Sequence, residues 1–136
     1  GATVPLEPSV VLCTERMRAI RRFSPENRYV EVEPGLLNGE LQAFLRPHGF
    51  FWPPDPTSAP YASIGGNLAC NAGGPRTVKY GASRDNVLGL SFVDGRGQVH
   101  RCGSHTSKGA VGYDLSRLLI GSEGTLGVIC SATLKL

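Results

Sequence analysis

The sequence predicts a single α+β domain, and three observations lead to this fold class. The chain has 136 residues, which is the size of one domain rather than two. Hydrophobic residues make up 40% and charged residues 18% of it, a balance that provides a globular core and argues against disorder. Helix and strand patterns are mixed without the strict βαβ order of a parallel sheet, so we expect α+β rather than a doubly wound α/β fold.

The N-terminal part is expected to form a strand, a helix, a second strand and a second helix. Residues 10–13 are a short apolar run, and Thr14 suits the N-cap of a helix that ends at the following Ser-Pro pair. Residues 29–33 alternate apolar and polar side chains, which indicates a half-buried strand. Asn38 is the expected N-cap of the second helix, and Gly49 suits its C-terminal end.

Residues 50–81 lose this periodicity. Four prolines precede residue 62, and four glycines follow as two pairs, Gly65-Gly66 and Gly73-Gly74. A helical turn at 67–71 is the only regular structure expected here. A long irregular stretch inside a compact domain is typical of a functional or ligand-binding segment.

The C-terminal part is expected to be rich in strands. The turn sequence at 94–97 joins two apolar runs and indicates a hairpin. The expected elements are strands at 87–93, 98–102, 128–130 and 132–136 and a short helix at 113–119. A second glycine-rich loop occupies 121–127.

Charge and hydropathy exclude several classes of protein. The net charge is +3 and no run of five like charges occurs, so no nucleic-acid partner is expected. No apolar stretch approaches the ~20 residues of a membrane span, and we expect membrane association only through partners. The N-terminal residues lack the basic start and apolar run of a signal peptide. We therefore expect a cytoplasmic protein.

The four cysteines show no metal-binding or disulfide spacing. Cys13, Cys70, Cys102 and Cys130 are far apart in the sequence, and no CxxC pair occurs. Free thiols in a reducing compartment are expected.

Glycine is the most unusual feature of the composition, with 18 residues in 136. Glycine-rich turns expose consecutive backbone N–H groups, which form concave sites for phosphate or pyrophosphate. Neither cluster is a Walker A loop, and the GxxGxxG of Gly121, Gly124 and Gly127 precedes a strand rather than a helix. The alternative interpretation is that these glycines form tight turns between strands.

The glycine-rich segments carry a family resemblance. IGGN-x-A-x-NAGG, KYG, GYDL and GSEGTLGVI resemble signature stretches of FAD-linked oxidases of the vanillyl-alcohol oxidase superfamily. The greatest similarity is to the D-2-hydroxyacid dehydrogenase branch, which includes the glycolate oxidase FAD subunit and D-lactate dehydrogenases. The similarity extends over residues 1–136, so the resemblance implies one FAD-binding domain, an α+β module of two small mixed α/β subdomains.

The resemblance also implies FAD as the cofactor and a set of residues around it. Three segments, 55–58, 63–67 and 71–74, would line the flavin and pyrophosphate. Tyr80-Gly81 would lie nearby, and 123–129 would offer backbone groups to the isoalloxazine and ribityl parts. The implied cofactor-binding residues are Asp55, Thr57, Ser58, Ser63, Ile64, Gly65, Gly66, Asn67, Asn71, Ala72, Gly73, Gly74, Tyr80, Gly81, Glu123, Gly124, Gly127, Val128 and Ile129.

The implied reaction is oxidation of a small D-2-hydroxyacid, of the glycolate or D-lactate type, by hydride transfer to the flavin. A separate electron acceptor or redox subunit would receive the electrons. No catalytic side chain is assigned, because the flavin supplies the redox chemistry and the protein positions it. The alternatives are an oxidase of the same superfamily that acts on another alcohol, and a catalytically inactive nucleotide-binding module.

Two parts of the family pattern are not found in the chain. The family has a PRG-x-GTGLSGG loop just before the position of Gly1-Ala2, and a C-terminal substrate domain. The resemblance therefore implies an FAD-binding domain with an incomplete N-terminal part, which is expected to bind FAD weakly or not at all and to be inactive by itself.

Two other groups of residues have a functional and an ordinary interpretation. His100, Cys102 and His105 offer metal-ligand chemistry, but a fourth ligand is not nearby in sequence, so a solvated hairpin end is preferred and no metal is expected. Asp114 and Glu123 offer a carboxylate pair, but capping and loop hydrogen bonds are the preferred roles.

The remaining candidates lie near the first glycine cluster. Cys70 is expected to be a buried small side chain rather than the site of a covalent flavin bond of the kind found elsewhere in the superfamily. Trp52 is expected in the core together with Phe50 and Phe51, and the alternative is that these aromatic residues form a wall of the flavin site. Arg76 and Lys79 are expected either to offset phosphate charge or to be exposed to solvent.

Overall fold

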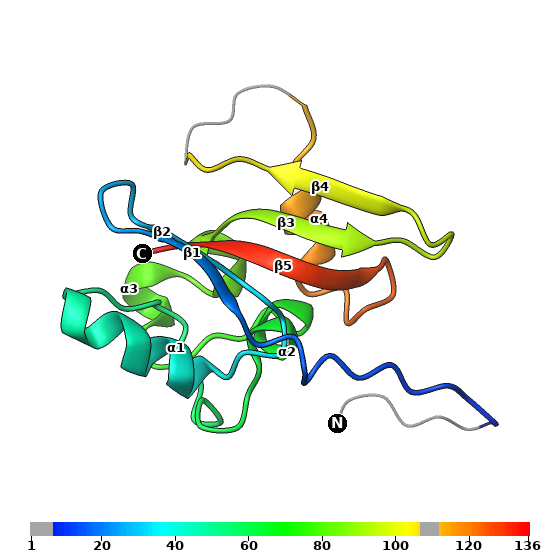
Figure 1. Cartoon of the computed structure of the whole chain (residues 1–136), viewed down its shortest axis with the longest axis horizontal. Helices are drawn as coiled ribbons and strands as arrows, with labels where there is room; N and C mark the ends of the chain where they lie inside the picture. The colour runs from blue at the N-terminus through cyan, green and yellow to red at the C-terminus, as the bar shows by residue number, and fades with distance from the viewer. Residues whose placement is uncertain (1–6, 107–111) are drawn as a thin grey trace.

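The computed structural model describes residues 7–106 and 112–136, and these residues form one antiparallel sheet covered by short helices (Figure 1). The strand order is β1-β2-β5-β3-β4. The strands are β1 Ile20–Ser24, β2 Tyr29–Val32, β3 Val87–Val93, β4 Val99–Gly103 and β5 Val128–Lys135. The α-helices are α1 Asn38–Leu45, α2 Ile64–Ala69, α3 Thr77–Tyr80 and α4 Leu115–Leu119, and short 3-10 helices span Arg46–His48 and Ser83–Asn86. The α+β class is thus confirmed.

The hydrophobic core lies on one face of the sheet. β5 pairs with both β3 and β2. Its Ala132 lies opposite Leu90 on β3, and its Leu134 lies opposite Val30 on β2. Figure 1 shows α1, α2 and α3 on one side of the sheet and α4 beside β3 and β4. The fully buried core side chains are Val30, Val32, Leu41, Leu45, Trp52, Ile64, Leu68, Ile120 and Leu134. The expectation that Trp52 belongs to the core is confirmed, and its Nε1 donates to the carbonyl of Asn86 at 3.1 Å. Phe50 is only partly buried against the core, and Phe51, also expected there, is 38% exposed.

The first predicted strand and helix are wrong. Residues 10–13 have no regular structure, and the segment expected to be a helix contains a turn after Thr14 and then β1. The reason is pairing with a distant segment: β1 is the edge strand beside β2, and the N–H of Glu33 donates to the carbonyl of Ala19 at 3.0 Å. The Glu33 carboxylate also accepts from the Ala19 N–H at 2.9 Å and binds Arg21. The capping residue and the Ser-Pro pair that predicted a helix act locally, so they did not predict these long-range hydrogen bonds.

The second strand and the second helix are confirmed, with one correction to the cap. Asn38 lies inside α1 rather than at its N-cap, which is Leu37. The Glu40 side chain accepts from the Leu37 N–H at 3.2 Å, while buried Asn38 donates its amide to the carbonyl of Pro54 at 3.0 Å. Gly49 ends the following 3-10 turn with φ 77°, as its expected role requires.

The C-terminal elements follow the prediction closely. β3 has the predicted bounds, β4 begins one residue later than expected, and β5 runs without the predicted break at residue 131. The predicted helical turn at 67–71 is instead α2, which begins earlier. α4 begins at Leu115 because Asp114 is its N-cap, with the carboxylate accepting from the Arg117 N–H at 2.9 Å. Within the described residues, no helix is long and apolar enough to cross a bilayer.

Candidate functional site

The first glycine loop, residues 63–74, is built around α2. Ser63 is the N-cap of this helix, and its Oγ accepts from the Gly66 N–H at 3.1 Å. Ile64 and Leu68 are fully buried, so the helix is anchored in the core while its N-terminal backbone stays at the surface. Gly65 lies so close to Pro34 that an added Cβ would be 2.7 Å from the Pro34 Cβ. Glycine at this position therefore lets α2 approach the end of β2.

The loop then turns back toward residues 55 and 83. The N–H of Ala72 donates to the carbonyl of Asn67 at 2.7 Å, and the carbonyl of Ala72 accepts from the Ser83 hydroxyl, also at 2.7 Å. Gly74 has φ 153°, and a Cβ there would lie 2.4 Å from the carbonyl oxygen of Asp55. No side chain is tolerated at Gly74 without movement of the backbone.

The second glycine loop, residues 121–127, lies directly against the end of α2. The Gly121 N–H donates to the carbonyl of Leu68 at 2.9 Å, and the Glu123 N–H donates to the carbonyl of Ala69 at 2.9 Å. Gly121, Glu123 and Gly124 all have positive φ values, of 87°, 53° and 79°. The fold therefore brings together two glycine loops that are distant in sequence.

The other predicted cofactor residues lie on the turn before α2, near the 3-10 helix Ser83–Asn86 and at the start of β5. Thr57 and Ser58 are exposed in a turn before α2, and Gly81 has φ 81° and packs against Asp85. Gly127 lies beside β3, where an added Cβ would be 2.7 Å from the Val93 carbonyl oxygen. Val128 and Ile129 begin β5 and pair with the last two residues of β3.

Asp55 holds Arg76 at the far end of the first loop. The Arg76 Nε lies 3.0 Å from Asp55 Oδ2, and the Arg76 N–H donates to Asp55 Oδ1 at 3.3 Å. The Arg76 guanidinium lies 5.1 Å from the centre of the Phe51 ring, and Tyr80 contacts that ring edge-on at 5.5 Å. These residues border a surface cavity of about 440 Å³. Arg76 is exposed, as one of the two expectations stated.

Several hydrogen-bond donors in and beside the first loop have no partner among the described residues. Asn67 is 3% exposed, and its Nδ2 forms no hydrogen bond, nor does the buried hydroxyl of Thr77. Within the described residues, the N–H groups of Gly73 and Gly74 are also free of hydrogen bonds. Thr77 Oγ1 would lie 2.6 Å from a Cβ at Gly73, so it belongs to the same cluster. Buried donors without acceptors are rare, and a polar anionic ligand such as the pyrophosphate of FAD fits this donor set.

Sequence reasoning missed Arg84, which contacts both loops. Its N–H donates to Asn71 Oδ1 at 2.9 Å, and its Nη2 donates to the carbonyl of Ile120, next to the second loop, at 2.7 Å. The only signal in the sequence was a cation ten residues after Gly74, which does not distinguish this arginine from the others.

The three residues with metal-ligand chemistry, for which a solvated hairpin end is the preferred interpretation, each contact another residue. His100 Nε2 lies 2.8 Å from Asp94 Oδ2, and His105 stacks on Tyr29 with ring centres 5.1 Å apart. Cys102 accepts from the Ser116 hydroxyl at 3.3 Å. Across residues 7–106 and 112–136, no group of three or more His, Cys, Asp or Glu residues is placed to hold a metal ion.

The carboxylate pair and the cysteines match the expectations except at Cys70. Asp114 caps α4, as its preferred role stated. All four cysteines are free. Cys70, however, is exposed rather than buried, because it is the C-cap of α2 and follows the buried turn of that helix.

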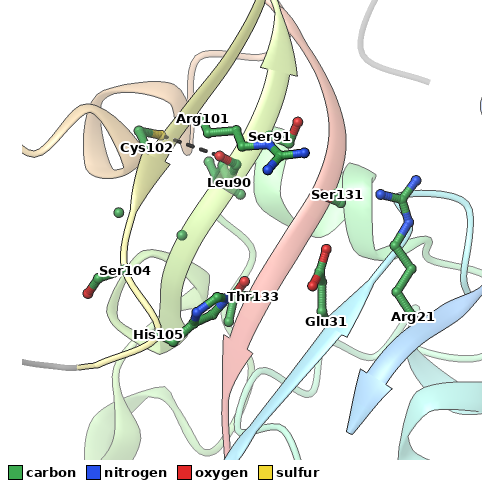
Figure 2. Close-up of a pocket in the computed structure, with 12 residues that line it drawn as sticks. Arg21, Glu31, Leu90, Ser91, Arg101, Cys102, Ser104, His105, Ser131 and Thr133 are labelled. Carbon is green, nitrogen blue, oxygen red and sulfur yellow. Dashed lines mark hydrogen bonds between the residues drawn. The ribbon is translucent and has the colours of Figure 1, made fainter.

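A second hollow lies on the face of the sheet opposite the core, away from the glycine loops (Figure 2). Ser91 faces Ser131 across β3 and β5, and Glu31 faces Thr133 across β2 and β5. Figure 2 shows the side chain of Arg101 extending over Ser91 at one end of this polar surface. Successive side chains of a strand point to opposite faces of the sheet, so these polar residues share the face that lies opposite the core.

Comparison with known proteins gives a family and several relatives. The FAD binding domain family matches residues 1–103. The glycolate oxidase subunit GlcD of Bacillus subtilis (strain 168) is 42% identical over 136 residues, which is 100% of this chain and 29% of that protein. The mitochondrial D-lactate dehydrogenase [cytochrome] of Arabidopsis thaliana is 43% identical over 136 residues, or 24% of that protein. The D-lactate dehydrogenase of Anaerostipes hadrus is 40% identical over 135 residues, or 28% of that protein.

A solved structure has the same arrangement of elements. An alkyldihydroxyacetonephosphate synthase matches with a TM-score of 0.75 and 26% identity, over 89% of this chain and 21% of that one. The chain thus spans less than a third of the length of the proteins that it matches. The predicted position of Gly1-Ala2 at the end of a further loop lies outside the described residues.

Proposed function

Because the chain belongs to the FAD binding domain family, we propose that its two glycine loops hold FAD for a flavin-dependent oxidoreductase of D-2-hydroxyacids, of the glycolate or D-lactate type. The observation that carries this proposal is the contact between the two loops beside a cluster of unpaired donors. The relatives of this chain carry the names of a glycolate oxidase subunit and of D-lactate dehydrogenases, which supports the substrate class.

The first loop is suited to the phosphates of the cofactor. Gly73 and Gly74 offer free N–H groups, and Asn67 and Thr77 offer side-chain donors beside them. Such donors bind anions because each hydrogen bond to a charged acceptor contributes about 1.5–3 kcal/mol. Ile64 contributes only its backbone, because its side chain is fully buried in the core.

The second loop is suited to a different part of the cofactor. Its exposed residues offer backbone groups without bulky side chains at Gly124 and Gly127, next to the start of β5. FAD, when bound, accepts the hydride of the substrate. The described residues orient and bind this group, and no side chain among them is assigned a proton-transfer role.

The partners follow from the same family. The substrate is a small hydroxyacid, and the electrons pass to an acceptor on a separate protein or subunit. One relative is named a subunit, and the name of another includes the word cytochrome, which supports a separate acceptor. The cytoplasmic location stays a prediction.

The test of the cofactor site is an NMR titration of the ¹⁵N-labelled chain with FAD. We expect the amide signals of residues 63–74 and 121–129 to shift, including those of Gly73 and Gly74, while those of Val99 and Arg101 on β4 stay in place. ADP, which carries the pyrophosphate without the flavin, should shift the first loop. NMR detects weak binding as well as strong binding, so the result does not depend on a high affinity. Absence of shifts at millimolar FAD, or shifts confined to the opposite face of the sheet, would contradict the proposal.

The substrate class needs a separate experiment. Protein expressed from the native gene and loaded with FAD is mixed with glycolate or D-lactate without oxygen, and the flavin absorption band is followed. Bleaching by either acid supports the proposal. Bound flavin that no hydroxyacid bleaches indicates a different alcohol substrate.

A further inference from the structure

Arg84 lies where the two glycine loops meet. It is part of the 3-10 helix Ser83–Asn86, just before β3. Its backbone N–H binds the side chain of Asn71 in the first loop, and its Nη2 binds the carbonyl of Ile120 at 2.7 Å. The same Nη2 would be 2.9 Å from a Cβ at Gly121, so the guanidinium lies against the backbone at the start of the second loop.

Arg84 also differs from neighbouring arginines in its ion pairing. Arg76 pairs with Asp55, and Arg117 pairs with Asp85. In the part of the chain that the structure describes, no carboxylate pairs with Arg84, and its Nε is buried without a hydrogen-bond partner. A partly buried cation without an anion is unfavourable. An anionic ligand at the adjoining loops reduces this cost.

We propose that Arg84 is a positioning residue of the FAD site: its backbone N–H binds the first glycine loop, its side chain fixes the start of the second, and its unpaired charge complements the phosphates of the cofactor. This inference rests on the proposed function of the loops. The contact at Ile120 places the second loop so that Gly121 and Glu123 donate to the last carbonyls of α2. Without the guanidinium, the second loop would keep these two hydrogen bonds to the end of α2, and both of their donors belong to exposed residues.

The first test measures the loops without any cofactor. Amide hydrogen exchange is compared in the wild-type chain, in Arg84→Met and in the control Arg101→Met, which removes an exposed cation on the opposite face of the sheet. We expect Arg84→Met to speed exchange at Gly121 and Glu123 by about tenfold, and to leave β3 and β5 protected. Arg84→Lys keeps the charge and one donor, so it should restore part of the protection. Unchanged exchange at both amides would overturn the loop contact.

The second test measures cofactor affinity and its salt dependence. FAD is titrated into the same proteins between low and high ionic strength. We expect Arg84→Met to weaken FAD binding about tenfold and to reduce the salt dependence of the affinity, because a charge near the phosphates is removed. Arg101→Met should change neither, and Arg84→Lys should retain the salt dependence. A purely structural residue would not alter the salt dependence.

The outcomes separate this inference from the proposed function. If the wild-type chain shows no FAD-dependent amide shifts, the proposed function fails and the cofactor role of Arg84 fails with it, while the exchange data still decide the loop contact. If the wild-type chain binds FAD at the loops and Arg84→Met binds it equally well with the same salt dependence, the inference on Arg84 is overturned and the proposed function stands.

Discussion

The five-stranded sheet and the two glycine loops hold their shapes in different ways. In the sheet, many backbone hydrogen bonds between paired strands stabilise the structure together, and cross-strand pairs such as Val30 and Leu134 fill the core. In the loops, a few single contacts decide the shape: the Ser63 cap, the approach of Gly74 to Asp55, and the bonds from the second loop to the end of α2.

The difference shows where the molecule tolerates change. A ladder of many similar contacts loses little when one of them is weakened. A loop that depends on one glycine or one cap loses its geometry when that residue is changed. The glycine loops are also not equivalent to each other, since the first is anchored by buried side chains of α2 and the second lies mostly exposed against it.

The largest expected effect comes from breaking the anchor of the first loop. Leu68→Ala removes a fully buried side chain, and such changes destabilise proteins by about 2–5 kcal/mol. Urea unfolding followed by circular dichroism measures this change. The matched control, Leu118→Ala, alters a leucine that is 61% exposed on α4 and should change the stability by less than about 0.5 kcal/mol. Equal effects of the two changes would show that α2 does not anchor the loop.

The two glycines of the NAGG segment should respond differently to alanine. Gly74→Ala places a Cβ 2.4 Å from the Asp55 carbonyl oxygen and forces an unfavourable φ. We therefore expect the free energy of unfolding to fall by about 1–3 kcal/mol and FAD binding to weaken. Gly73→Ala meets only the Thr77 side chain, at 2.6 Å, which is able to rotate away. Its effect on stability should be smaller. Urea unfolding of both variants ranks them, and a larger loss at Gly73 would contradict the geometry of the loop.

A smaller effect is expected at the helix cap. Ser63→Ala removes the oxygen that accepts from the Gly66 N–H and should destabilise the protein by about 1 kcal/mol. Ser63→Asp keeps an acceptor and should restore most of the stability. The control, Ser9→Ala, changes an exposed serine near the N-terminus. If Ser63→Ala and Ser9→Ala have the same unfolding midpoint, the cap does not hold the loop.

The smallest expected effect is a pH dependence confined to the β3–β4 hairpin. The Gln98 N–H and then the His100 side chain hold the pKa of Asp94 below its usual 3.8. A carboxylate with a lowered pKa stabilises the folded state above its usual value, and this contribution is lost as the pH falls through the folded-state pKa. The protection factors of the Arg96 and Gln98 amides, measured relative to their intrinsic exchange rates, should therefore fall below about pH 3.8, before the glycine loops respond. Asp94→Asn should remove this dependence, and an unchanged pH profile in that variant would contradict the assignment.

Local sequence patterns predicted much of the regular structure. The apolar run at residues 87–93 and the turn after it predicted β3 with the observed bounds and β4 within one residue, because turn residues and strand patterns act between near neighbours. The glycine-rich segments identified the family through several motifs that occur together, and FAD binding domain membership is confirmed.

The tertiary structure decided the features that depend on distant residues. β1 is a strand rather than a helix because β2 and Glu33 satisfy its backbone from across the sheet. Cys70 is exposed because α2 ends at the surface, and Arg84 joins two loops because Asn71 and Ile120 come together only in the folded chain. The sequence by itself determined which segments turn, alternate and carry the cofactor motifs. The fold alone determined which of these segments touch, since contacts between residues far apart in sequence depend on the whole chain being packed.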